Sequence, residues 1–334
     1  MRILVTGGAG FIAHHLIDEL LINTDAEIVS LDRLDYSGNL NRLHDVLKDR
    51  PTRSRVKIVH HDLKAEINPH VAAHIGKIDM ILHLAAGSHV DRSIDFPMEF
   101  ALDNTIGTIN ILQFARTQDL ERFVYFSTDE VFGPAPAGVK YKERDRYNST
   151  NPYSASKAAG EEFAVAFEKT YGLPIYITHT MNVFGERQSP EKFIPMCIRR
   201  VRDGDKITIH ADPTKTQAGS RHYIHARDVA GALMFLLGHD IKLPPDYGGA
   251  KCPKFNIVGA EEWDNLKLAN TIAEIQGQSL NYEMVDFHSS RPGHDLRYAL
   301  DGSLMEELGW QPKFDVRERL EQTVRWSLQN KEWL

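Results

Sequence analysis

Short apolar segments alternate with amphipathic segments along the first half of the chain. Apolar, β-branched runs predict strands at 3–5, 27–31, 56–59, 80–82, 123–126 and 175–178. Helical periodicity between them predicts two long helices, one over 100–117 and one over 154–171 that ends at Gly172. Strands that alternate with helices form right-handed βαβ units. The pattern therefore predicts an α/β fold with a doubly wound parallel sheet.

The alternation becomes less regular beyond about residue 180. Loops rich in Gly, Pro and Asp occupy 203–205, 211–219 and 244–253. We expect a smaller α/β domain in this part of the chain, which would bind the substrate. The predicted division assigns residues 1–182 and about 222–248 to the sheet domain, and about 183–221 and 249–334 to the smaller domain.

Composition and charge exclude several classes of protein. Hydrophobic residues make up 42% of the 334 residues, as in an ordinary globular protein, and the formal net charge of −7 gives no overall positive field to attract nucleic acid or an acidic membrane. Cys197 and Cys252 lie far apart and form neither a disulfide framework nor a zinc-ligand spacing. The glycine cluster close to Met1 leaves no room for a signal peptide. We expect a cytoplasmic protein that binds neither nucleic acid nor membrane.

A glycine-rich turn follows the first predicted strand. Residues 6–13 contain the pattern G-x-G-x-x-A and lead directly into a helical run. Backbone N–H groups in such a turn approach a pyrophosphate closely, and the helix dipole favours its negative charge. Asp32 ends the second strand, where a carboxylate accepts hydrogen bonds from ribose hydroxyls and repels a 2′-phosphate. A Rossmann-type domain that prefers NAD is expected, although the adjacent Arg33 leaves NADP open. The candidate cofactor-binding residues here are Gly7, Gly10, Phe11, Ile12, Asp32 and Arg33.

Tyr153 and Lys157 lie four residues apart at the start of the second long helix, so they share one face. A cation beside a phenol stabilises the phenolate, which can then take a proton from a sugar hydroxyl as hydride leaves the same carbon. The Y-x-x-x-K spacing is common, and an exposed helix pair is the alternative.

Two carboxyl groups and two hydroxyl groups follow the predicted strand 123–126, in the order Ser127, Thr128, Asp129 and Glu130. Residues just after the carboxyl end of a parallel strand line the ligand crevice. Two carboxyls held close together cannot both ionise freely, so one can serve as an acid and the other as a base. The alternative is a helix N-cap. We expect no helix to follow, because Gly and Pro residues at 133–136 break the chain.

With these motifs, the chain resembles the extended short-chain dehydrogenases that act on nucleotide sugars, and most closely the dTDP-glucose 4,6-dehydratase group. The similarity covers nearly the whole length. Its most specific element is the triplet 128–130, because related epimerases and decarboxylases usually lack the Asp-Glu pair. The other matching segments are 6–13, 31–33, 36–40, 83–86, 88–93, 151–159, 190–195 and 291–295.

The resemblance implies an NAD-dependent lyase that converts a nucleoside diphosphate hexose into a 4-keto-6-deoxy sugar and water. Tyr153, supported by Lys157 and Thr128, would remove the O4 proton while hydride passes from C4 to NAD. Glu130 would abstract the C5 proton as Asp129 protonates the departing C6 hydroxyl, and the hydride would return to C6. Further cofactor contacts are implied for Asp62, Leu63, Leu84, Ala85, Ala86, Asn104 and Ser127, and substrate contacts for Ser88, Asn182, Lys192, Arg221 and Arg291.

Several positions depart from the pattern of that group. Gly87 stands where it usually carries Glu, Phe132 where it carries Tyr, and Val183 where it carries a second Asn. His179 replaces a nearby Arg, and 220–225 differs from the group's Arg-Asp-Trp stretch. The base of the nucleotide therefore stays open among dTDP, UDP, GDP and CDP.

Other functions remain as alternatives. A nucleotide-sugar 4-epimerase or uronic acid decarboxylase would use the same oxidation step, and a non-catalytic NAD-binding protein would keep the fold alone. No metal site is expected, because the adjacent histidine pairs at 14–15 and 60–61 lack the H-x-x-x-H spacing of metal ligands. The resemblance also implies a homodimer that pairs helices 100–117 and 154–171 across a two-fold axis.

Overall fold

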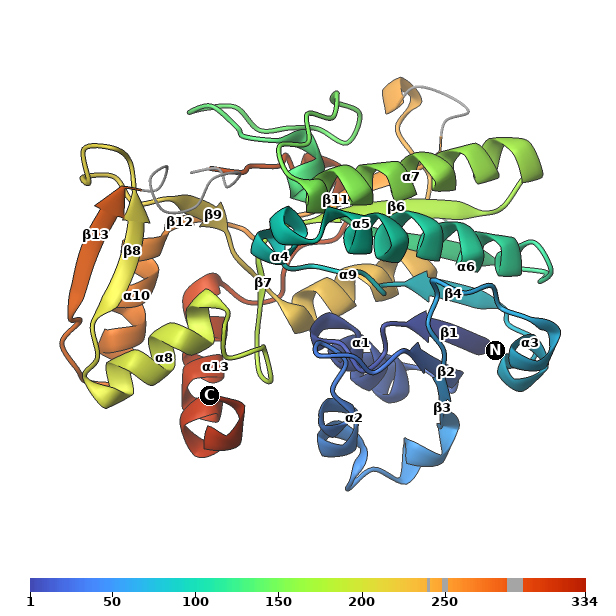
Figure 1. Ribbon diagram of the computed structural model, residues 1–334, viewed down its shortest axis with the longest axis horizontal. Coiled ribbons are helices and arrows are strands. Elements are labelled where there is room, and N and C mark those ends of the chain that lie inside the picture. The colour runs from blue at the N-terminus through green and yellow to red at the C-terminus, as the bar shows by residue number, and fades with distance from the viewer. Residues whose placement is uncertain (239–240, 248–251, 287–296) are drawn as a thin grey trace.

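A seven-stranded parallel sheet forms the centre of the larger lobe (Figure 1). The computed structural model describes residues 1–238, 241–247, 252–286 and 297–334. The strand order is β11-β6-β5-β4-β1-β2-β3. The strands are β1 (Arg2–Thr6), β2 (Glu27–Asp32), β3 (Val56–His60), β4 (Met80–His83), β5 (Arg122–Thr128), β6 (Ile175–Thr180) and β11 (Lys254–Ile257).

The central strands are apolar on both faces because helices cover both faces of the sheet. Ile3, Leu4 and Val5 of β1 are fully buried. The chain runs from β1 outward to β2 and β3, then returns to place β4 on the other side of β1. Ligands of doubly wound sheets bind at this reversal, beyond the carboxyl ends of the strands. The topology therefore locates the site beyond β1 and β4.

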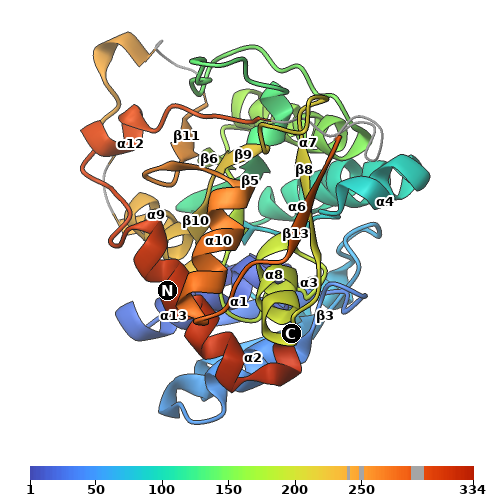
Figure 2. The same ribbon diagram turned by 90° about the vertical axis from the view of Figure 1, so that its left-hand side faces the viewer.

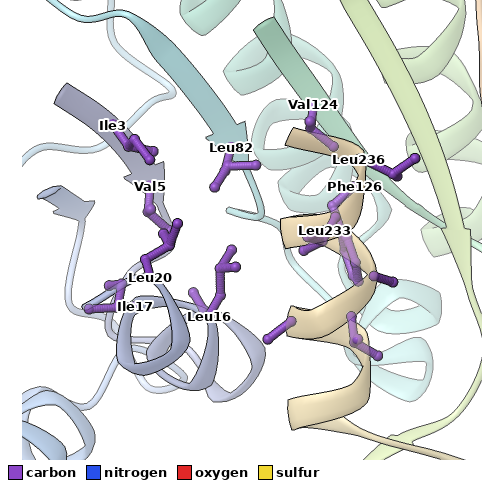
Figure 3. Close-up of a cluster of buried hydrophobic side chains, with 14 of the residues drawn as sticks. Ile3, Val5, Leu16, Ile17, Leu20, Leu82, Val124, Phe126, Leu233 and Leu236 are labelled. Carbon is purple, nitrogen blue, oxygen red and sulfur yellow. The ribbon is translucent and has the colours of Figure 1, made fainter. Parts of the chain in front are cut away.

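Helices α1 (Phe11–Asn23) and α9 (Ala226–Gly238) pack on one face of the sheet. Figure 3 shows their contact with the strands, with Leu20 beside Val5, Leu16 turned toward Leu82 and Leu233 beside Phe126. α2 (Leu40–Leu47) adds to the same side. The opposite face is covered by α3 (Pro69–Ile75), α6 (Gly107–Ala115) and α7 (Pro152–Tyr171).

The predicted helix over 100–117 is interrupted in the structure. Short helices α4 (Val90–Asp95) and α5 (Pro97–Phe100) lead into a π-helix, η2 (Ala101–Ile106), and only then into α6. The predicted helix over 154–171 is confirmed as α7, which starts two residues earlier with Asn151 as its N-cap and ends at Gly172 with φ +69°. Gly172 adopts the left-handed conformation that glycine favours after a helix.

The smaller lobe lies beside the carboxyl edge of the sheet (Figure 2). Its core joins α8 (Phe193–Asp203), α10 (Asn265–Ile275) and α13 (Val316–Gln329). Three two-stranded sheets accompany these helices: β7 (Val183–Phe184) with β10 (Ile224–His225), β8 (Ile207–Ala211) with β13 (Tyr282–Asp286), and β9 (Ser220–His222) with β12 (Glu262–Asp264). The remaining elements are α12 (Ser303–Glu307) and the 3₁₀ turns η1 (Pro51–Arg55), η3 (Asp129–Phe132), η4 (Pro245–Tyr247) and η5 (Lys331–Trp333).

One part of the expected division differs from the structure. Strand β11 falls within 249–334, which we assigned to the smaller domain, yet it pairs with β6 and completes the large sheet. The chain thus returns to the larger lobe for one strand, a crossing that short-range periodicity does not reveal. Within the described ranges, no helix is long and apolar enough to cross a membrane.

Candidate active site

A cavity lies beyond the carboxyl ends of β1, β2, β4, β5 and β6, where the topology places it. Its walls come from the glycine turn, the ends of these strands, the start of α7 and the segment before α8. The lining includes most of the predicted site: Gly7, Gly10, Phe11, Ile12, Asp32, Arg33, Asp62, Leu63, Leu84, Ala85, Ala86, Ser88, Ser127, Thr128, Asp129, Glu130, Tyr153, Lys157, Asn182 and Lys192.

The glycine turn packs closely against the segment after β4 and leaves the N-terminus of α1 uncapped. Gly7 has φ +68°, and a Cβ atom there would lie 2.9 Å from the backbone of Ala85. Gly10 is the N-cap of α1, and no side chain caps that helix. The first-turn N–H groups of α1 are therefore available to a phosphate rather than to a capping side chain.

The Asp32 carboxylate is fixed beside this turn. One oxygen accepts from the backbone N–H of Ala9 at 3.0 Å and the other from that of Leu34 at 2.8 Å. A carboxylate oxygen has more than one lone pair, so Asp32 can also accept from ribose hydroxyls. The glycine turn and Asp32 together fit an NAD molecule.

The Tyr153 and Lys157 side chains both face the cavity from one side of α7, as their spacing predicts. Burial raises the pKa of Tyr153 above its ordinary value, the Glu130 and Asp129 carboxylates raise it further, and the Thr128 hydroxyl lowers it. Burial also lowers the pKa of Lys157 to about 7.

The Lys157 ammonium has its own fixed partners. It donates to the backbone oxygen of Phe126 at 2.6 Å and lies 4.3 Å from the centre of the Tyr125 ring. Within the described residues no hydrogen bond joins Lys157 to Tyr153. The two side chains therefore share the cavity without a direct hydrogen bond between them.

Asp129 and Glu130 line the same wall of the cavity but differ in burial: Asp129 is buried and Glu130 is partly buried. Asp129 is 5% exposed, and burial together with the Glu130 carboxylate raises its pKa to about 7. Its Oδ2 atom has no hydrogen-bond partner among the residues that the structure describes, and neither does the buried Oγ of Ser127. Unpaired buried oxygens that border a cavity are suited to a ligand, because an unmade hydrogen bond is costly. Glu130 accepts from Asn151 Nδ2 at 3.1 Å.

The local sequence holds these groups in place. Thr128 accepts from the N–H of Glu130 at 3.4 Å and begins the turn η3, which directs both carboxyls from the end of β5. We expected no helix after this strand, so the capping interpretation is partly right: Thr128 caps a single 3₁₀ turn, which Gly133 ends with φ +75°. Ser93 Oγ accepts from the N–H of Tyr153 at 3.1 Å and so fixes the start of α7.

Comparisons with known proteins agree with this geometry. Residues 4–323 match the family model described as GDP-mannose 4,6 dehydratase. The dTDP-glucose 4,6-dehydratase of Escherichia coli is 34% identical over 100% of this chain and 95% of its own length. The chain belongs to this dehydratase family.

Two solved structures extend the comparison to three dimensions. That of DesIV, a dTDP-glucose 4,6-dehydratase from Streptomyces venezuelae with NAD bound, is 34% identical with a TM-score of 0.86, covering 100% of this chain and 98% of that one. The UDP-glucose 4-epimerase of Thermus thermophilus in complex with NAD is 27% identical with a TM-score of 0.84, covering 97% and 98%. The expected family, Rossmann-type fold, NAD dependence and nucleotide-sugar 4,6-dehydratase activity are confirmed.

The expected substrate contacts occupy different places. Ser88 after β4, Asn182 after β6 and Lys192 before α8 all line the cavity. Arg221 lies on β9 outside the lining residues, with its guanidinium 4.7 Å from the centre of the Tyr298 ring, and its charge lowers the pKa of Asp129. Arg291 lies outside the described residues.

Asn104 does not line the cavity. Its amide pairs with both the N–H and the C=O of Gly87, at 2.8 and 3.0 Å, and donates to Ser156 Oγ at 2.8 Å. These contacts use the amide oxygen and both N–H bonds of a side chain that is 1% exposed. Asn104 therefore positions the loop after β4 and the catalytic helix α7, and any effect on the cofactor is indirect.

Two of the family departures form a buried cluster behind the catalytic wall. The Phe132 and His179 rings lie 4.8 Å apart and are fully buried. His179 Nε2 contacts the Glu161 carboxylate at 3.1 Å, and Lys254 donates to the same carboxylate at 2.8 Å. Glu161 is one helical turn beyond Lys157, so this network anchors α7 to the sheet.

The sequence did not identify Arg42, Ser93 and Asp103 as site residues. Arg42 and Asp103 line the cavity. Arg42 is 6% exposed and donates to the backbone oxygens of Ala9 and Ser37. Ser93 lies in segment 88–93, which matches the family pattern and could have identified it as a site residue. No motif near Arg42 or Asp103 in the sequence indicates which residues they contact.

The raised pKa of Asp129 predicts a pH-dependent stability difference. In the folded chain Asp129 holds its proton up to about pH 7, against an ordinary value of 3.8. The native state therefore binds this proton more tightly than the unfolded chain, and its stabilisation is complete at low pH and lost as the pH rises through about 7. Asp129→Asn removes the ionisable group, and with it the cost of keeping a buried carboxyl group away from its ordinary ionisation near neutral pH. Its free energy of unfolding should rise relative to wild type between about pH 4 and pH 7, by on the order of 3 kcal/mol.

Urea unfolding of both proteins at several pH values measures this difference. A difference that stays constant from pH 4 to pH 8 would show that Asp129 ionises normally in the folded protein.

Proposed function

We propose that Tyr153, Asp129 and Glu130 carry out the 4,6-dehydration of a nucleoside diphosphate hexose in this cavity. The observation that carries the proposal is their convergence: a buried phenol, a carboxyl that holds its proton near neutral pH and a second carboxylate face one space beside the dinucleotide site. An epimerase needs the phenol but has no use for the two acids.

Each group has one role in this proposal. Tyr153 accepts the O4 proton of the hexose as its phenolate, a form favoured by the positive charge of Lys157 and by the hydroxyl of Thr128. Glu130 then removes the C5 proton, which the neighbouring C4 carbonyl has made acidic. Asp129 gives its proton to the C6 hydroxyl, which leaves as water. NAD, when bound, would supply the oxidation at C4 and the reduction at C6, and Glu130 would return its proton to C5 in that last step.

The two carboxyls are matched to opposite roles. Asp129 is buried and keeps its proton, as an acid must. Glu130 is partly buried and hydrogen-bonded to the Asn151 amide, which donates to it and so favours the charged form that a base needs.

Asn182, Arg221 and Arg291 would hold the diphosphate of the substrate, Lys192 would lie near its base, and Ser88 would be a further substrate contact. The test is incubation with dTDP-glucose, GDP-mannose, and UDP- and CDP-hexoses, followed by mass spectrometry. We expect loss of one water from at least one of them. A product of unchanged mass would indicate epimerisation, and loss of carbon dioxide from a nucleoside diphosphate uronic acid would indicate decarboxylation.

We further propose that the protein is a homodimer. Large apolar side chains are exposed on η2 and its neighbours, where Met98 is 70% exposed, Leu102 39% and Ile106 38%, and Phe163 on α7 is 39% exposed. Helix α7 packs against α5, η2 and α6, and α6 and α7 lie side by side in Figure 1, so the exposed apolar groups belong to neighbouring elements. Exposed apolar patches of this kind are typical of subunit interfaces.

Sedimentation velocity should therefore show a dimer at micromolar concentration, and Met98→Glu combined with Phe163→Glu should give monomer. A wild-type monomer at that concentration would contradict the proposal.

Both cysteines are buried thiols, which fits a reducing compartment such as the cytoplasm. Cell fractionation would test that location.

A further inference from the structure

Arg33 lies next to Asp32 at the adenosine end of the cavity, where its side chain is held by carboxylates. It makes a bidentate contact with the Asp103 carboxylate, in which Nη1 donates to one oxygen and Nη2 donates to the other at 2.8 Å. Its Nε donates to Asp35 at 2.7 Å. The side chain of Asp103 is only 10% exposed and that of Arg33 is 26% exposed, so solvent screens this pair less than a surface pair.

Acidic groups dominate this end of the cavity. Four carboxylates line it, those of Asp32, Asp35, Asp62 and Asp103. Arg33, Arg42 and Lys64 lie with these carboxylates, and the other two cations of the lining, Lys157 and Lys192, lie on α7 and just before α8. Arg42 donates to backbone oxygens, and Lys64 lies 3.5 Å from Asp62 and 3.9 Å from Asp103. Each cation that faces the ribose is thus already matched with an acidic group or with backbone oxygens.

The fold places Asp103 opposite Arg33 through two local features. Asp103 and Asn104 are consecutive residues of the π-helix η2, yet Asp103 contacts Arg33 while Asn104 contacts Gly87 and Ser156. π-helical turns occur often at functional sites. Gly87 leaves space for this arrangement, because a Cβ atom there would lie 3.2 Å from Asp103 Oδ2 and 3.2 Å from the Phe100 ring.

We propose that Asp103 is a specificity residue that sets the preference for NAD over NADP by holding Arg33 in an ion pair. An arginine beside the second strand of a Rossmann domain is the kind of residue that accommodates a 2′-phosphate. Here the guanidinium fork is occupied by Asp103. A 2′-phosphate would have to break this pair and would then lie close to the released carboxylate as well as to Asp32. This inference rests on the proposed dinucleotide site and concerns binding, independently of the sugar chemistry.

Asp103→Asn tests the inference by direct binding. The full chain, freed of bound dinucleotide, is titrated with NAD and with NADP by calorimetry, without sugar. We expect the dissociation constant for NADP to fall about tenfold, because a neutral amide no longer holds the guanidinium in an ion pair and so leaves it available to the phosphate. The constant for NAD should change less than about threefold, since Asp32, which faces the ribose hydroxyls, is untouched.

The double variant Arg33→Met with Asp103→Asn separates the ion pair from simple repulsion. The gain in NADP affinity should disappear in it, because the freed guanidinium is what binds the phosphate. Asp119→Asn, which removes the same charge from an exposed turn after α6, is the matched control and should leave both constants unchanged. Thermal unfolding and NAD affinity report whether each variant folds.

An unchanged NADP constant in a folded Asp103→Asn protein would overturn the inference. So would a gain that persists without Arg33, since Asp103 would then act by repulsion alone. If the protein failed to dehydrate any sugar nucleotide while the NAD and NADP dissociation constants changed as expected, the proposed chemistry would be wrong and this inference would still hold.

Discussion

Glu130→Gln is expected to stop the reaction after oxidation at C4, with dehydration slowed by about 10²–10⁴-fold. The glutamine amide cannot accept the C5 proton. It can keep the hydrogen bond from Asn151 Nδ2 through its carbonyl oxygen, so the geometry of η3 should be retained. Mass spectrometry of the quenched reaction, after trapping with a carbonyl reagent, should show a 4-keto sugar that still carries its C6 hydroxyl. In deuterated water, exchange of the C5 hydrogen should fall in the same proportion.

Glu162→Gln provides the matched control. Glu162 is an exposed carboxylate on α7, outside the residues that line the cavity, and its loss should leave turnover within about twofold of wild type. If Glu130→Gln turned over normally, the acid pair would be unreactive and the epimerase alternative would be favoured instead.

Tyr153→Phe is expected to lower the rate of every product by about 10²–10⁴-fold, because no group then takes the O4 proton. Nearly the whole side chain remains, so packing against Phe100, whose ring centre lies 6.4 Å away, should persist. The dissociation constant for the nucleotide sugar should change less than about threefold. In contrast to Glu130→Gln, no 4-keto sugar should be trapped, because the chemistry fails at its first step.

Tyr125→Phe removes a different buried phenol hydroxyl beside α7. That hydroxyl donates to the backbone oxygen of Lys157 at 2.9 Å and does not line the cavity. Its loss should cost about 1 kcal/mol of stability and leave turnover within a few-fold of wild type. Equal loss of turnover in the two variants would show that Tyr153 acts by holding the structure together.

Local sequence patterns were sufficient to predict most elements of the larger lobe. The six predicted strands are all present, because a fully buried parallel strand reads as an apolar run. The glycine turn could also be recognised locally, because the strand before it and the helix after it in the sequence define its role. Tyr153 and Lys157 share a face through helix geometry alone.

Features that depend on distant segments could not be predicted in this way. The return of the chain to the large sheet at β11 and the π-helix within the predicted helix over 100–117 have no local sequence signal that we could identify. The network of Glu161, His179 and Lys254 joins the consecutive elements α7 and β6 to β11, and Lys254 lies 93 positions from Glu161 in the chain.

The sequence by itself determined the fold class, the position of the glycine turn and the candidate catalytic groups, since each depends on residues within one or two neighbouring elements. Tertiary structure decided how those groups are tuned. Asp129 keeps its proton because folding removes water from it, and Arg33 is held by a residue 70 positions away. Proton affinity and ion pairing depend on what surrounds a side chain in space, and sequence neighbours do not specify that environment.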